Sequence, residues 1–196
     1  VARINLIELY HFTGNFRKGL AVSDETVSQS REVRYRYGEA IGMRYRTIML
    51  TDIGRFGEAM DNALASLKIH QDMEMREDEL ASLVVACRAG LAQGAIEEVE
   101  PMLETATELL DAYDTEGFAP VVHAWRARVY AMQGRMSEAC DAVELSTKVE
   151  TRPWPAQRAR TNLNLARAYL ILDAREEALA VSEEALRLAD ASGYRH

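Results

Sequence analysis

Residues with the chemistry for catalysis or metal binding are few in this sequence, and they are scattered. The histidines are His11, His70, His123 and His196. None stands in a His-Glu-x-x-His motif, and none has a carboxylate at ligand spacing on the same helix face, so the pattern does not indicate a metal site. Adjacent acids such as Glu97 and Glu98 point about 100° apart on a helix. This orientation favours a solvated helix face over a role in acid/base catalysis.

Nucleophile and phosphate motifs are also absent from the sequence. The glycines do not cluster into a phosphate-binding loop, and no Gly-x-Ser-x-Gly motif or Cys/His pairing indicates a nucleophile. Cys87 and Cys140 are too few and too far apart in sequence for a metal knuckle, and we expect both to be buried, reduced thiols. The sequence therefore predicts no enzyme activity, no catalytic residue, no metal and no cofactor.

The charge balance bears on the class of partner. The chain has 31 acidic residues against 23 Lys and Arg, a formal net charge of −8 and a pI near 5.1. A nucleic-acid partner would need a basic face, so we expect none. No apolar run approaches the twenty or so residues that a membrane span needs. Val1 to Tyr10 carries Arg3 and Glu8 and does not resemble a signal peptide. We expect a cytoplasmic protein.

The elements that must position any site recur along the chain. Glycines stand forty residues apart at Gly14, Gly54, Gly94 and Gly134, and Asp173 takes the same place in a fifth copy. Each follows a helical, apolar-rich run and precedes another, which indicates a helix C-terminal cap that turns the chain into an antiparallel partner helix. Small residues recur at fixed distances from these turns, so the helices of each hairpin are expected to pack closely.

Two copies of this pattern resemble the tetratricopeptide repeat (TPR). Residues 130–139 and 169–178 each place a tyrosine before the turn and an alanine after it. The resemblance implies an all-α solenoid of about five antiparallel hairpins in a right-handed superhelix. It implies a long-repeat variant of the TPR, of the kind found in bacterial signalling and regulatory proteins. A HEAT-like fold is the alternative, because forty residues is also a HEAT-like length. The predicted repeats cover approximately residues 1–30, 31–73, 74–113, 114–152 and 153–193 of a single domain, 1–196.

The first hairpin predicts an incomplete end. Its first helix is shorter than the later ones and carries the apolar residues Ile4, Leu6, Ile7 and Leu9. A repeat buries its face only against its neighbours. We expect a fragment of a longer chain, or a partner over this end, with self-association through the repeat ends as a substitute.

An arginine column is the strongest candidate for binding. Six residues before three successive turns stand Arg88, Arg128 and Arg167. In the TPR fold the first helices line the concave groove, so the resemblance implies a stripe suited to carboxylates of an extended acidic peptide. The alternative is that each Arg pairs with an acid of a neighbouring helix. The other candidate residues in the groove are Arg44, Tyr45 and Trp125.

The resemblance implies a function in binding. We expect a non-catalytic scaffold that holds a peptide or partner domain, as the regulatory part of a larger signalling protein. The alternative is a small-molecule effector domain of a transcriptional regulator or signalling ATPase. An effector site should be a closed pocket on which aromatics such as Tyr45 and Trp125 converge, whereas a peptide groove should be open and polar.

Overall fold

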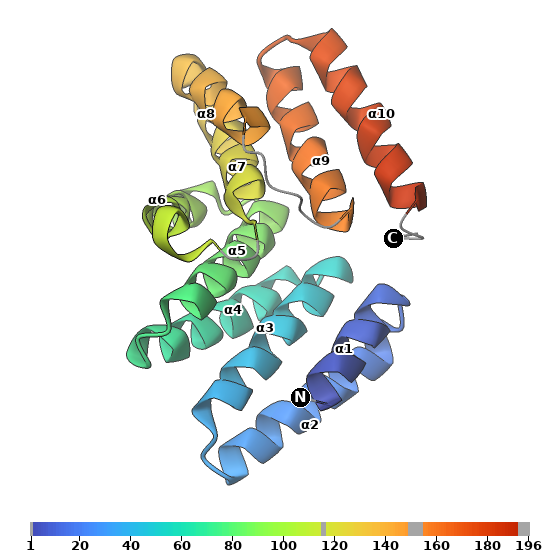
Figure 1. Ribbon diagram of the computed structural model, residues 1–196, viewed down its shortest axis with the longest axis vertical. Coiled ribbons are helices and arrows are strands. Elements are labelled where there is room, and N and C mark those ends of the chain that lie inside the picture. The colour runs from blue at the N-terminus through green and yellow to red at the C-terminus, as the bar shows by residue number, and fades with distance from the viewer. Residues whose placement is uncertain (1, 115–116, 149–154, 192–196) are drawn as a thin grey trace. The chain divides into compact units, whose positions relative to one another are not determined.

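The chain is helical throughout the part that the structure describes. A computed structural model describes residues 2–114, 117–148 and 155–191, which form ten α-helices and no strand (Figure 1). The helices are α1 (Ala2–Phe12), α2 (Phe16–Glu32), α3 (Arg36–Asp52), α4 (Phe56–Asp72), α5 (Arg76–Gln93), α6 (Ile96–Tyr113), α7 (Ala119–Met132), α8 (Met136–Lys148), α9 (Pro155–Ile171) and α10 (Arg175–Ala191). The all-α prediction is confirmed. The repeat boundaries predicted at residues 152, 153 and 193 lie outside the described residues.

The chain divides into two compact units, residues 1–105 and 106–195. In the first unit, α3 packs against both α1 and α5, and the second helices α2 and α4 pack beside α3. In the second unit, α7 packs against α8 and α9, and α9 packs against α10. Helix α6 begins in the first unit and ends in the second. The single domain and the superhelix stay predictions.

All five predicted turns lie where the sequence places them. Gly14, Gly54, Gly94, Gly134 and Asp173 have φ of 68°, 78°, 84°, 77° and 59°. This left-handed conformation suits glycine, which has no Cβ, and Asp tolerates it better than most residues. After each turn residue, the next backbone N–H donates to the carbonyl five residues earlier, as from Arg55 to Leu50 at 2.9 Å. These bonds form the Schellman cap of each first helix.

The first two turns between repeats, at Arg34 and Glu74, use the same geometry without glycine. Arg34 and Glu74 have φ of 57° and 56°, and the following N–H groups donate to Ser30 and His70. Helices α2, α3 and α4 each have 17 residues. Three residues then separate each from the next helix, so successive helices begin every twenty residues from Phe16 to Ile96. From α2 to α6 the chain thus turns in the same way within repeats and between them.

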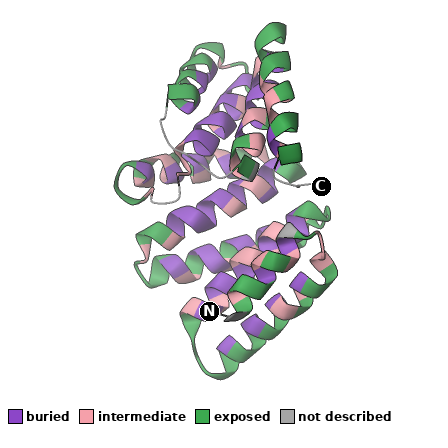
Figure 2. Cartoon of the chain, turned by 45° about the vertical axis from the view of Figure 1, so that its right-hand side comes forward, coloured by how far each residue is buried: buried purple, intermediate pink, exposed green. Residues whose placement is uncertain are grey.

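Buried residues lie on the facing sides of the helices (Figure 2), and the small residues of the register are among them. Five residues after the turns, Ala59, Val99 and Ala139 are fully buried and Ala178 is nearly so. Twelve residues after the turns, Ser66 donates to the carbonyl of Ala40 at 2.9 Å, and Ser146 donates to that of Pro120 at 2.7 Å. Each bond joins the two helices of one hairpin. The expected close packing is confirmed.

Gly90 explains one departure from the TPR pattern. It occupies the position before the turn where the other copies hold Tyr or Leu. A Cβ on Gly90 would lie 2.4 Å from Val99 Cγ2 and 2.8 Å from Met60 Cε. The missing side chain thus makes room for residues of α4 and α6 against α5.

Candidate functional site

The predicted binding residues fall in both units. Arg44, Tyr45 and Arg88 belong to α3 and α5 in the first unit. Trp125 and Arg128 on α7 and Arg167 on α9 belong to the second. Each group has its own surroundings.

Arg88 has a carboxylate partner. Its guanidinium donates to Asp52 at the end of α3, and both side chains are largely buried. Asp52 also bonds His11 Nε2 on α1 at 2.8 Å. One carboxylate therefore links the first helices of three successive repeats. This arrangement supports the structural alternative for Arg88, and its role in recognition stays a prediction.

Arg44 and Tyr45 are held in a similar way. Arg44 pairs with Asp78 on α5 at 3.0 Å, and the two side chains are 14% and 17% exposed. The Arg44 guanidinium lies 6.0 Å from the centroid of the Tyr45 ring, and the Tyr45 hydroxyl donates to Glu8 on α1. Such contacts connect neighbouring repeats and leave little of either side chain for a ligand. Their binding role is a prediction that these contacts do not support.

Trp125 belongs to the core of the second unit. It is 4% exposed, on a helix whose other buried residues include Val122, Ala124 and Val129. A side chain buried to this extent offers almost no surface to a ligand. Its candidacy as a binding residue stays a prediction.

Arg128 and Arg167 differ from the other arginines of the column. Arg128 is half-buried and donates to Asn164 Oδ1 on α9 at 3.3 Å. Arg167 is exposed, and no described residue accepts a hydrogen bond from it. Burial lowers the pKa of Arg128, and the positive charge of Arg167 lowers this pKa further. The two cations on α7 and α9 are thus near enough to repel each other, and neither forms an ion pair with a carboxylate among the described residues.

Apolar residues continue the same face. Met132 and Ile171 follow Arg128 and Arg167 by four residues, which places each one turn further along the same side of its helix. They are 48% and 40% exposed. The sequence analysis did not select Met132, Ile171 or Asn164, although the spacing of four residues was a usable signal. We use the name α7/α9 surface for the five residues Arg128, Met132, Asn164, Arg167 and Ile171.

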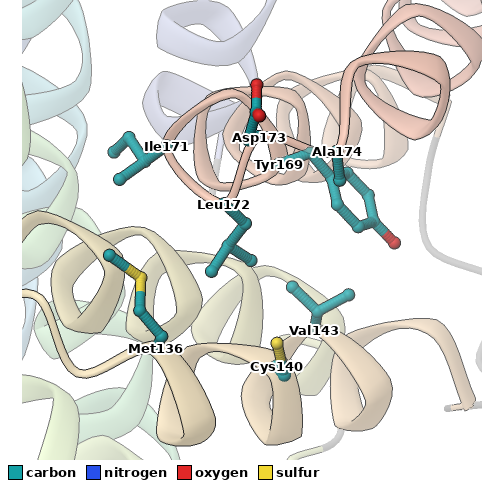
Figure 3. A pocket seen from close by; sticks show the side chains of 8 residues that line it. All are labelled: Met136, Cys140, Val143, Tyr169, Ile171, Leu172, Asp173 and Ala174. Atoms are coloured by element: carbon teal, nitrogen blue, oxygen red, sulfur yellow. The ribbon is translucent and has the colours of Figure 1, made fainter.

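A hollow of about 490 Å³ opens beside this surface, between α8 and the end of α9 (Figure 3). Its lining residues are Met136, Cys140, Val143, Tyr169, Ile171, Leu172, Asp173 and Ala174. The lining includes neither Tyr45 nor Trp125, the aromatics expected at an effector pocket. The cysteine prediction is half right, because Cys87 is buried, where burial raises its thiol pKa, and Cys140 is exposed.

The described residues show neither a metal site nor a membrane span. Within residues 2–114, 117–148 and 155–191, no three side chains of His, Cys, Asp or Glu gather in a way that could hold a metal ion. No helix in the same ranges has both the length and the apolar character to cross a bilayer.

Comparison with known proteins identifies the fold. No protein-family model matches the chain, and no curated protein does. Among solved structures, a kinesin light chain protein of nearly identical TPR-like repeats from Podosopora anserina is similar at 20% identity, with a TM-score of 0.69 over 100% of this chain and 96% of that one. The chain is a TPR-like repeat protein by fold.

Two further solved structures are also similar to this chain in fold. A single-residue variant of the same Podosopora anserina protein gives a TM-score of 0.71 at 18% identity, over 98% of this chain and 95% of that one. BtubC (BKLC) from P. vanneervenii gives 0.69 at 20% identity, over 97% and 80%. The HEAT-like alternative is therefore set aside.

Proposed function

We propose that this TPR-like chain binds an extended acidic segment of a partner protein through the α7/α9 surface. The observation that carries the proposal is the pair Arg128 and Arg167, which faces no carboxylate among the described residues although the chain has a net charge of −8. Arg44 and Arg88, in contrast, are paired with Asp78 and Asp52. A carboxylate from outside would relieve the repulsion between the two guanidinium groups and accept charge-assisted hydrogen bonds from both.

The apolar neighbours define the segment further. Met132 and Ile171 lie one helical turn beyond the arginines. When an acidic residue of the bound peptide pairs with Arg128 and Arg167, an apolar residue nearby in the peptide would therefore contact Met132 and Ile171. Asn164 fixes Arg128 through its Oδ1 atom and is itself held by a bond from its Nδ2 to the carbonyl of Arg160 at 2.9 Å. The ligand class is therefore an acidic peptide with an apolar residue close in sequence.

Fluorescence anisotropy with short labelled peptides tests this function. The peptides combine Asp or Glu with one Leu, and a second set replaces the acids by Lys. We expect the acidic set alone to bind. The double variant Arg128→Glu/Arg167→Glu should raise Kd by at least about a hundredfold, because it removes two charge-assisted contacts of roughly 1.5–3 kcal/mol each and adds repulsion.

The matched control is Arg175→Glu/Arg187→Glu. It makes the same change of charge on α10, where both side chains are exposed by more than half. This control should bind as the unchanged protein does. Equal loss in both double variants would show that binding follows net charge, and unchanged binding in the first would refute the role of Arg128 and Arg167.

The context of this binding belongs to the same proposal. We place the chain in the regulatory part of a larger cytoplasmic signalling protein, as the resemblance of its sequence implies. Support for a reducing compartment comes from Cys87 and Cys140, which are both free thiols.

A small-molecule effector is the second candidate function, and the hollow beside α9 favours it. Its volume of about 490 Å³ suits a small ligand, and its lining is mostly apolar. Tyr169 contributes a hydroxyl, and burial raises the pKa of this group. Cys140→Trp would fill the hollow. This variant should abolish effector binding in a ligand screen followed by thermal shift, and it should leave acidic peptides bound to the α7/α9 surface.

A further inference from the structure

In the first two hairpins, one long apolar side chain of the second helix reaches the first helix of the next hairpin. This side chain stands six residues after the turn, at Leu20 on α2 and Met60 on α4. Leu20 packs against the cluster that contains Leu50. Met60 is 6% exposed, and its Cε atom lies 2.8 Å from where a Cβ on Gly90 would be. Each contact joins a second helix to the residue four positions before the next turn.

The fourth hairpin has a shorter side chain at this place. Cys140 on α8 and Tyr169 on α9 hold the two equivalent positions, and both line the hollow of about 490 Å³. Figure 3 shows the Cys140 sulfur pointing from α8 toward α9. The cysteine side chain is too short to fill the space that Leu or Met fills in the first two hairpins, and α8 contacts α9 far less than α4 contacts α5. The hollow therefore lies where a side chain that joins two hairpins is missing.

The lining of the hollow indicates the class of ligand that fits it. Most of the described lining residues are apolar, and none of them is Lys or Arg. A charged group of a ligand would lose water there without gaining an ion pair, which is unfavourable. An apolar group loses nothing of this kind and is removed from water. The lining therefore favours an uncharged, mostly apolar molecule.

Tyr169 supplies one hydrogen-bond donor at the same place. Its side chain is half-buried, and no described residue forms a hydrogen bond with its hydroxyl. Burial raises the pKa of this hydroxyl, and the negative charge of Glu177 raises it further. The hydroxyl therefore keeps its proton at neutral pH and can donate a hydrogen bond to an acceptor atom of a ligand.

We propose that a small, uncharged, apolar molecule with one hydrogen-bond acceptor binds in the hollow and joins α8 to α9, as Leu20 and Met60 join the earlier hairpins. This inference rests on the second candidate function, an effector beside α9, and adds the class of the ligand and its effect. The apolar part of the ligand lies against Cys140, in the place of the longer side chain, and the acceptor bonds the Tyr169 hydroxyl. The bound molecule strengthens the contact between the fourth and fifth hairpins.

Ligand-observed NMR with three naphthalene derivatives tests the class of ligand. The probe is 2-acetylnaphthalene, which has an apolar ring system and one carbonyl acceptor, whereas 2-ethylnaphthalene lacks the acceptor and 2-naphthoate carries a charge. We expect 2-acetylnaphthalene to bind most tightly. Tyr169→Phe should weaken its binding by about fivefold, the effect of one neutral hydrogen bond, and should leave 2-ethylnaphthalene unchanged. Tightest binding of 2-naphthoate, or equal losses for both uncharged probes, would overturn the proposed class.

Cys140→Met tests the place of the ligand. It introduces the residue that Met60 provides in the second hairpin, so it should raise the Tm of the free protein and weaken the binding of 2-acetylnaphthalene by about tenfold or more. Circular dichroism checks folding, and Cys140→Leu replaces this variant if it does not fold. Leu145→Met is the matched control, because Leu145 is 46% exposed on α8 and does not line the hollow. The control should bind the probe as the unchanged protein does.

Hydrogen exchange measures the effect of the ligand. Bound 2-acetylnaphthalene should slow amide exchange in α8 and at the end of α9 and leave α3 and α4 unchanged. Binding that Cys140→Met does not weaken, or that leaves exchange in α8 unchanged, would overturn this inference and leave an effector function standing. Failure of all three probes to bind would overturn it as well. Acidic peptides should still bind Cys140→Met, so a failure of the α7/α9 surface would be seen separately.

Discussion

Glu74 holds a backbone conformation that glycine would adopt more easily. Its φ is 56° at an exposed turn between α4 and α5. Left-handed geometry costs about 1–2 kcal/mol for a residue with a Cβ. We expect Glu74→Gly to stabilise the protein by up to about 1 kcal/mol, because part of this gain is offset by the greater freedom of glycine in the unfolded chain.

Chemical denaturation measures this effect. The matched change is Gly54→Ala, where φ is 78° and a Cβ would meet nothing within 4 Å. Its loss of stability, about 1 kcal/mol, would come from the backbone alone. A destabilised Glu74→Gly variant would show that the Glu74 side chain makes a contribution beyond the turn.

His70 makes stability depend on pH. It is fully buried on α4, its Nδ1 lies 2.8 Å from Ser82 Oγ on α5, and its Nε2 has no partner among the described residues. Burial lowers the pKa of His70 below its usual value. The neutral form therefore belongs to the folded state, and its contribution to stability is complete above the unfolded pKa of about 6.5 and is lost as the pH falls toward the folded pKa.

The variant His70→Gln should flatten this dependence. Unfolding free energy measured between about pH 7 and pH 5 should fall less steeply in the variant than in the unchanged protein. Burial also lowers the pKa of His123, so some acid sensitivity should remain. Identical slopes in the two proteins would contradict the role of His70.

At the scale of the element, Gly90 sets how closely α5 meets its neighbours. A Cβ there would lie 2.4 Å from Val99 Cγ2, so Gly90→Ala must displace α6 or its side chains. We expect a loss of about 1–3 kcal/mol, the usual range for overpacking a core. Gly57→Ala is the control, because its Cβ would meet nothing within 4 Å and alanine favours a helix by about 0.5–1 kcal/mol. In thermal denaturation, the Tm of Gly90→Ala should fall and the Tm of Gly57→Ala should rise.

The elements also show how far the sequence alone could predict the molecule. Turns at Gly54 or Gly94 were predictable because one residue type suits their backbone geometry, and the small residues were predictable because close packing needs them at a fixed period. Arg34 and Glu74 carry no such signal. Nor does the pairing of Arg88 with Asp52, since the partner lies 36 residues away and depends on how adjacent helices are offset. For that reason the sequence could not separate Arg88 from Arg128 and Arg167.

At the scale of the whole molecule, repeats that contact only their neighbours should respond locally to damage. Gly90→Ala disturbs α4, α5 and the start of α6. Hydrogen exchange followed by mass spectrometry should show faster exchange in these helices, with a much smaller change in α9 and α10. An equal increase in all helices would indicate that the chain opens as one cooperative unit.

The equal spacing of the helices from Phe16 to Ile96 has a consequence for how the chain can be rearranged. Because turns within and between repeats share one backbone conformation, their helices are joined by interchangeable links. New termini could be opened at Arg34 or Glu74 as readily as at Gly54. If two successive helices were deleted or duplicated between any two of these turns, the remaining helices would keep their twenty-residue spacing. An array of this kind can therefore change its length without any change in the sequence of its turns.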